Sequence, residues 1–60
     1  MYKPDKAGTM NRSQTHIMTA VGDGANLQQI FKRSGYKSMQ SVYLLVKQLV
    51  ENEILKTTEQ

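Results

Sequence analysis

The clearest hydrophobic pattern in the chain lies in its C-terminal half. Five apolar residues recur there at positions i, i+3, i+4, i+7 and i+8, the spacing of one buried face of an amphipathic helix. They are Val42, Leu45, Val46, Leu49 and Val50. Ser38 is a suitable N-cap for this helix, and we expect the helix to end near Glu51 and Asn52.

A shorter helix is predicted immediately before it. The sequence Asn-Leu-Gln-Gln at residues 26–29 is typical of a capping box, in which Asn26 accepts from the first turn and Gln29 reaches back. Its buried face, which would pack against the following helix, consists of Leu27, Ile30 and Phe31. Gly35 would end it, because glycine tolerates the left-handed backbone of a helix terminus.

The first helix is expected to start near Asn11 or Ser13 and to end at the Gly-Asp-Gly turn of residues 22–24. It carries a short apolar stripe made of Ile17, Met18 and Val21. His16 is the only histidine of the chain. Because no carboxylate or thiol lies near it in the sequence, we interpret it as a surface side chain rather than a ligand or a base.

Both ends of the chain lack this helical periodicity. Residues 1–10 are polar and contain Pro4 and Gly8, so we predict a flexible N-terminal arm, with residues 11–60 forming the folded domain. Residues 53–59 mix Ile and Leu with two threonines, and we expect a short strand or an extended tail there.

These elements predict a mainly all-α domain, built as a three-helix helix-turn-helix bundle. The last two helices are separated by a short turn that contains glycine, which is characteristic of this motif. In such a bundle the N-terminal half of the third helix is presented to a partner, and the major groove of B-DNA is wide enough to admit a helix.

The stretch QIFKRSGYKSMQSVYLLVKQLVENEILK, residues 29–56, resembles without a gap the winged helix-turn-helix of the LexA repressor's N-terminal domain. The shared features are an Ile in the second helix, a Gly-aromatic-basic-Ser turn, the apolar register of the third helix and a Leu-x-x-x-x-Ile-Leu exit. The resemblance implies a winged-helix-like fold. Because only about six residues follow Ile54, we expect the β-wing to be short or missing.

By position, the resemblance also implies which residues face DNA. In that family the start of the third helix enters the major groove, and the matching positions here are Ser38, Gln40, Ser41, Tyr43 and Leu44. Lys37 and Lys47 would lie near the phosphates. Leu44 departs from the family pattern, which has a polar, groove-facing residue at this position.

The chemistry of these side chains suits the task. Gln40 can make a bidentate pair with adenine in the major groove, and Ser38 and Ser41 can donate to a phosphate or a base. Phosphates could also be neutralised, and the register fixed, by Lys37, Lys32 and Arg33. For each residue the simpler alternative is a solvated surface side chain.

The distribution of charge favours a polyanion as partner. Residues 1–47 carry seven Lys and Arg against two Asp, a net charge of +5, whereas residues 48–60 carry one Lys against three Glu, a net charge of −2. Such asymmetry suits a partner bound on one side of the molecule. Ordinary solubilising charge is the alternative explanation.

Several classes of function find no support in the sequence. The chain has no cysteine, which fits a reducing, cytoplasmic location, and it has no apolar run approaching the roughly 18 residues that span a bilayer. It has no nucleophile–base pair, no cluster with metal-ligand spacing and no phosphate-binding loop. We therefore expect no enzymatic activity, no catalytic residues, no metal, no cofactor and no membrane partner.

The sequence thus predicts a small DNA-binding transcriptional regulator, a repressor or an activator, which inserts residues 38–51 into the major groove; its size suggests a phage or mobile-element origin. It would bind double-stranded DNA as a homodimer, because one helix reads only about four base pairs. The C-terminal tail could supply the dimer contact. The alternative is an interaction module that docks on a host or partner protein through Met39, Tyr43 and Leu44, since such apolar patches often mark protein contacts.

Overall fold

The computed structural model describes residues 1–58 as a small, mostly helical domain with a short antiparallel sheet. Along the chain the elements are β1 (Tyr2–Pro4), α1 (Arg12–Val21), α2 (Leu27–Ser34), α3 (Met39–Glu51) and β2 (Leu55–Thr57). The prediction of a mainly helical domain with three helices is confirmed, and a strand is present in the C-terminal tail. Residues 59 and 60, the end of that predicted tail, lie outside the described part of the chain.

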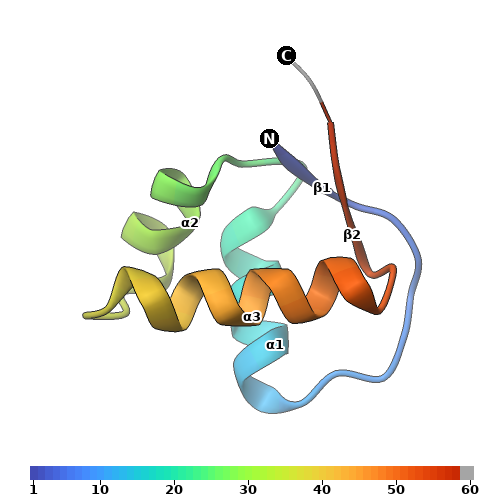
Figure 1. The fold of residues 1–60 in the computed structure, drawn as a ribbon, viewed down its shortest axis with the longest axis horizontal. Coiled ribbons are helices and arrows are strands. Elements are labelled where there is room, and N and C mark those ends of the chain that lie inside the picture. Colours follow the sequence, from blue (N-terminus) through green and yellow to red (C-terminus); the bar gives the residue numbers. More distant parts are fainter. Residues whose placement is uncertain (59–60) are drawn as a thin grey trace.

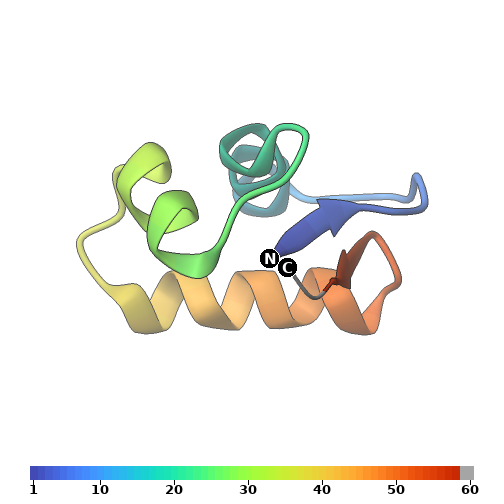
Figure 2. The same cartoon turned by 90° about the horizontal axis from the view of Figure 1, so that it is seen from above.

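The helices form two layers. Figure 1 shows α3 lying across the front of the molecule, with α1 crossing behind it and α2 at the end where α3 begins. Seen from above, α3 forms one layer along its whole length, and α1 and α2 lie together in the other layer (Figure 2). The two strands lie at the opposite end from α2, beside the C-terminal half of α3. One long side of α3 is therefore not covered by any other element.

Local sequence signals explain where α1 and α2 begin. Each is preceded by an asparagine that forms a complete capping box with the glutamine three residues later. The side chain of Asn11 accepts from the backbone N–H of Gln14 at 2.8 Å, and Asn26 accepts from that of Gln29 at 2.9 Å. The capping box predicted at Asn26 is confirmed, and of the two predicted starts of the first helix the structure selects Asn11.

The start and end of α3 also match the prediction, with one difference. Ser38 occupies the N-cap position, but its side chain makes no capping hydrogen bond. Asn52 is the C-cap, and its N–H bonds the carbonyl of Gln48 at 3.0 Å. The chain then turns through Glu53, which has a φ of 63°, and enters β2. The first turn of α3 therefore keeps backbone N–H groups that the Ser38 hydroxyl does not satisfy.

The core is made of aliphatic side chains from every helix, β2 and the segment between α1 and α2. Its fully or nearly fully buried members are Ile17, Ala20, Val21, Ala25, Ile30, Val42, Val46, Leu49, Ile54 and Leu55. Within the predicted stripe of α3, Val42, Val46 and Leu49 are buried, whereas Leu45 and Val50 are half-buried at its margins. From α2, Ile30 is fully buried, and Phe31 packs against the core from a half-buried position.

The sheet joins the two ends of the described chain. β1 and β2 are antiparallel, with Tyr2 opposite Thr57, Lys3 opposite Lys56 and Pro4 opposite Leu55. On its other edge β1 bridges the segment between α1 and α2, where Tyr2 and Ala25 exchange backbone hydrogen bonds of 2.8 and 3.0 Å. β1 thus lies between β2 and Ala25, and it ties three segments distant in sequence into one element.

This pairing corrects the expectation that residues 1–10 form a flexible arm. Tyr2–Pro4 is a strand, and the backbone pairing continues beyond it, because Asp5 donates to the carbonyl of Ile54 at 2.8 Å and Lys6 to that of Glu53 at 3.1 Å. Further along, Gly8 lies against the side chain of Ile54. A strand of three residues whose partner is about 50 positions away has no local periodicity by which a sequence pattern could reveal it.

No helix within residues 1–58 combines the length and the apolar character that crossing a membrane requires.

Two leucines of α3 provide a matched test of this architecture. Leu49 is fully buried and Leu44 is 51% exposed. We expect Leu49→Ala to lower the free energy of unfolding by about 2–5 kcal/mol through lost burial and a cavity. Leu44→Ala should change it by no more than about 0.5 kcal/mol. Urea unfolding followed by circular dichroism measures both, and equal losses in the two variants would contradict the assigned orientation of α3.

Candidate functional site

The uncovered side of α3 carries most of the residues singled out in the sequence. We call this surface the outer face of α3; it consists of Gln40, Ser41, Tyr43, Leu44, Lys47 and Glu51, all of them exposed. Gln40, Leu44, Lys47 and Glu51 follow the spacing i, i+4, i+7 and i+11, so they form one line along the helix. Ser41 and Tyr43 flank this line on opposite sides. The structure therefore brings the predicted α3 residues together on one continuous surface.

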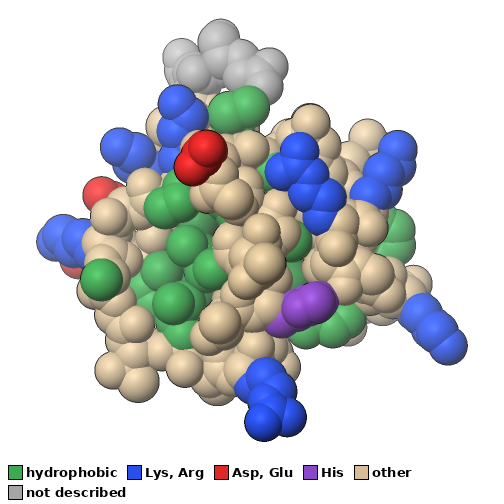
Figure 3. Space-filling view, turned by 180° about the vertical axis from the view of Figure 1, so that it is seen from behind, with side chains coloured by type: hydrophobic (Ala, Val, Ile, Leu, Met, Phe, Trp, Pro, Cys, Tyr) green, Lys and Arg blue, Asp and Glu red, His purple; other side chains and the backbone are tan. Residues whose placement is uncertain are grey.

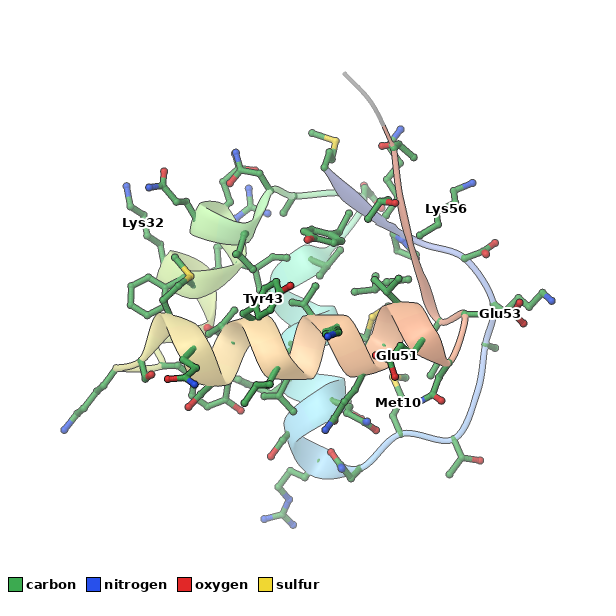
Figure 4. All side chains as sticks on the ribbon, in the orientation of Figure 1. Met10, Lys32, Tyr43, Glu51, Glu53 and Lys56 are labelled. Carbon is green, nitrogen blue, oxygen red and sulfur yellow. The ribbon has the colours of Figure 1, made fainter. Side chains whose placement is uncertain are left out.

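Two neighbouring side chains give this surface an apolar part. Tyr43 is 46% exposed and Leu44 is 51% exposed, which makes them the most exposed large hydrophobic side chains of the described chain. Figure 4 shows Tyr43 near the middle of α3. Met39 lies one turn before Tyr43 but is half-buried, so it contributes less to the patch than the sequence suggested. The outer face is thus mixed, with polar groups at its N-terminal end and an apolar centre.

The turn before α3 is held by contacts that the sequence did not reveal. Gly35 adopts the left-handed conformation predicted for it, with a φ of 76°. His16 on α1 donates through Nε2 to the carbonyl of Ser34 at 2.7 Å, and its ring meets that of Tyr36 edge-on, with the ring centroids 5.6 Å apart. The Ser34 hydroxyl in turn donates to the carbonyl of Phe31 at 3.1 Å. We call this set of contacts the turn clasp, because it fixes residues 34–36 to α1.

His16 therefore does more than the sequence predicted. Its side chain is exposed, as expected, but it also forms a polar link between α1 and the C-terminal end of α2. His16 and Ser34 are 18 positions apart in the sequence, and neither residue lies in a recognisable motif that would signal this contact. By fixing the turn, His16 helps to determine where Lys37 and the first residues of α3 lie.

The predicted phosphate-binding side chains do not all point to the same place. Lys37 and Lys47 are exposed at the beginning and on the outer face of α3. Lys32 extends from α2 (Figure 4), also in an exposed position. Arg33, by contrast, donates to the carbonyl of Ala20 at the end of α1, at 3.3 Å. Its guanidinium group is thus directed to the layer behind α3, where it supports the packing of α1 on α2.

The remaining charges are spread over the surface. Seen from the face opposite α3, Lys and Arg side chains lie mainly around the edge of the molecule, and hydrophobic side chains gather between them (Figure 3). Lys6 forms an exposed ion pair with Glu53, with 3.3 Å between Nζ and Oε2. On the sheet, Lys3 and Lys56 lie directly opposite each other, an arrangement in which like charges repel. The positive charge is therefore not concentrated on one face alone.

The candidate site is an open surface. Residues 1–58 contain no pocket and no group of three or more His, Cys, Asp or Glu side chains that could hold a metal ion.

The turn clasp can be tested by removing its imidazole. We expect His16→Ala to lower the free energy of unfolding by about 1 kcal/mol, because the hydrogen bond to the Ser34 carbonyl and the ring contact with Tyr36 are lost. Ser13→Ala, on the exposed first turn of the same helix, is the matched control and should leave the urea midpoint close to that of the wild type. An unchanged midpoint for His16→Ala would show that the clasp contributes no stability.

Comparisons with known protein families, with curated proteins and with solved structures give no match for this chain.

Proposed function

We propose that this chain is a small DNA-binding transcriptional regulator that places the N-terminal half of α3 in the major groove. The observation that carries the proposal is the uncovered outer face of α3, whose first turn presents Gln40 and Ser41, three and four residues after Lys37. A short turn with a left-handed Gly35 joins α2 to α3, as in a helix-turn-helix. In that motif the second helix projects from the domain and can enter the groove.

The sheet supports a winged-helix-like form of this motif, which the sequence resemblance also implied. β2 follows α3 after a short turn and lies beside it, where the first strand of a wing would be. The second strand is β1, which comes from the opposite end of the described chain. The sequence led us to expect a short or missing wing; in this proposal the wing is short and is assembled from two distant segments.

The side chains of the outer face offer the contacts that such a complex needs. The amide of Gln40 can donate to and accept from one adenine, and the hydroxyl of Ser41 can bond a base or a phosphate. The apolar side chain of Leu44, one turn further, can contact a thymine methyl group. Lys37 precedes this reading surface and Lys47 follows it, so phosphates on both sides of the groove can be neutralised. Lys32 adds a more peripheral charge.

A dimer is part of the proposal, because one helix in one groove gives limited affinity and specificity. Met1 and Thr58 exchange backbone hydrogen bonds, of 2.9 and 3.2 Å. In an antiparallel ladder, the backbone N–H and C=O groups of alternate residues face the partner strand. Like those of Thr58, the backbone groups of Lys56 therefore face β1, whereas those of Leu55 and Thr57 point away from it. We propose that this outer edge of β2 pairs with β2 of a second copy.

The first test is fluorescence anisotropy with a labelled duplex of mixed sequence, at about 50 and 200 mM salt. We expect the affinity of the wild type to fall steeply with salt, because each phosphate contact releases condensed counterions. Lys47→Ala should weaken binding and reduce the slope of log K against log salt by about one. Lys6→Ala removes the same charge from a lysine paired with Glu53, and it should leave the slope nearly unchanged.

Two outcomes would contradict this proposal. One is the absence of binding at the lower salt concentration with tens of micromolar protein. The other is an equal effect of Lys47→Ala and Lys6→Ala, which would mean that net charge rather than the outer face of α3 governs binding.

A second candidate function is supported by the exposure of Tyr43 and Leu44. Large apolar side chains next to each other at the centre of an uncovered helix suit a protein partner, which would bury them. In this case the chain would be an interaction module that docks on another protein through the same face. The two candidates share a surface but differ in which side chains contribute most of the binding free energy.

Two sets of substitutions separate these candidates. For a protein captured from the native host, we expect Tyr43→Ala plus Leu44→Ala to abolish capture, whereas Lys32→Ala plus Lys37→Ala plus Lys47→Ala should weaken it only slightly. For the duplex the order of the two effects should be reversed. Arg33 is left intact in both sets because its bond to Ala20 couples it to folding. Capture that survives the apolar substitutions would rule out this second function.

A further inference from the structure

One residue of the outer face has the wrong charge for a polyanion partner. Glu51 is the last residue of α3, is exposed, and lies in line with Gln40, Leu44 and Lys47. Figure 4 shows it in front of the C-terminal half of the helix. Within residues 1–58 the one ion pair found joins Lys6 and Glu53, so the Glu51 carboxylate carries its charge without such a partner.

Because α3 is long, the position of the Glu51 charge depends on how the helix docks on a DNA duplex. Glu51 lies eleven positions after Gln40, which corresponds to about 16.5 Å along the helix axis at about 1.5 Å per residue. The major groove is about 12 Å wide. If α3 lay flat across the groove, with its whole outer face against the duplex, Glu51 would come close to the phosphates of one strand. If only the first turns entered the groove, the C-terminal end would tilt away and Glu51 would remain in solvent.

We propose that Glu51 determines the docking angle of α3 by repelling the phosphate backbone. This inference rests on the proposed DNA-binding function and adds to it. Repulsion by Glu51 disfavours the flat arrangement, in which the C-terminal end of α3 would lie against the phosphates of any duplex. The arrangement that keeps Glu51 away from the phosphates is the one that inserts Gln40 and Ser41. Glu51 is thus a specificity-determining residue that acts by excluding a competing mode of binding.

The chain contains a close control for this inference. Glu53 lies two residues further along, also carries one negative charge and is also exposed, but it belongs to the turn after α3 and pairs with Lys6. Glu51→Gln and Glu53→Gln therefore change the net charge equally, and they differ in where the charge is removed. Any difference between the two variants reports on position and not on total charge.

The experiment is anisotropy with the labelled mixed-sequence duplex, using the wild type and both variants at about 50 and 200 mM salt. Glu51→Gln should bind this generic duplex about three- to tenfold more tightly than the wild type at the lower salt, and most of the gain should vanish at the higher salt because the repulsion is screened. Glu53→Gln should change the affinity less than about twofold. Urea unfolding of both variants checks that the fold is retained.

The possible failures can be told apart. If the wild type shows no salt-dependent binding, the proposed DNA-binding function itself fails. If the wild type binds and Glu51→Gln gains no more than Glu53→Gln, DNA binding stands and the role of Glu51 is overturned. A gain for Glu51→Gln that persists unchanged at the higher salt would also overturn it, since electrostatic repulsion must weaken with screening.

Discussion

Burial of Val42, Val46 and Leu49 on one side of α3 is the constraint on which the rest of this molecule depends. These three side chains are almost fully inaccessible to solvent, and they hold the helix against α1 behind it. Because a helix is rigid and its faces are fixed relative to one another, burying this side forces Gln40, Leu44 and Lys47 to the opposite, uncovered side. The composition of the candidate site is therefore a consequence of core packing.

A chain of 60 residues can bury only a small core, and closing that core requires its two ends. β1 and β2 supply Tyr2 and Leu55 from opposite ends of the described chain, and the bridge to Ala25 connects the sheet to the segment between α1 and α2. The backbone pairing of a few strand residues thus links three parts of the chain that are distant in sequence. Unfolding of the sheet would expose Leu55 and Ile54 and would loosen the support behind the C-terminal half of α3.

The outer face of α3 combines features that favour different partners. Its N-terminal end has hydrogen-bonding groups and a flanking lysine, its centre is apolar, and its C-terminal end carries the carboxylate of Glu51. A DNA duplex would match the first part, tolerate the second and be repelled by the third. This gradient along one helix is the physical basis for proposing insertion by the first turns, and it also explains why a protein partner at the centre is a reasonable second candidate.

The sequence alone was sufficient for the helices, because their signals are local. The capping box at Asn26, the glycine at residue 35 and the apolar stripe of α3 each involve residues within one or two turns, so spacing predicted them correctly. The exposure of Gln40, Tyr43 and Leu44 followed from the same periodicity. The identity of their binding partner did not follow from the sequence, since an exposed helix face has the same residue pattern whatever it binds.

The contacts between residues distant in sequence were determined only by the tertiary structure. The strand Tyr2–Pro4, predicted as part of a flexible arm, exists because β2 and Ala25 offer it backbone partners on both edges. The contact of His16 with Ser34 and the bond from Arg33 to Ala20 likewise depend on how α1 and α2 cross. Such contacts form when the elements pack against one another. The spacing of residues along the chain does not predict them, because it does not show which side chains packing will bring together.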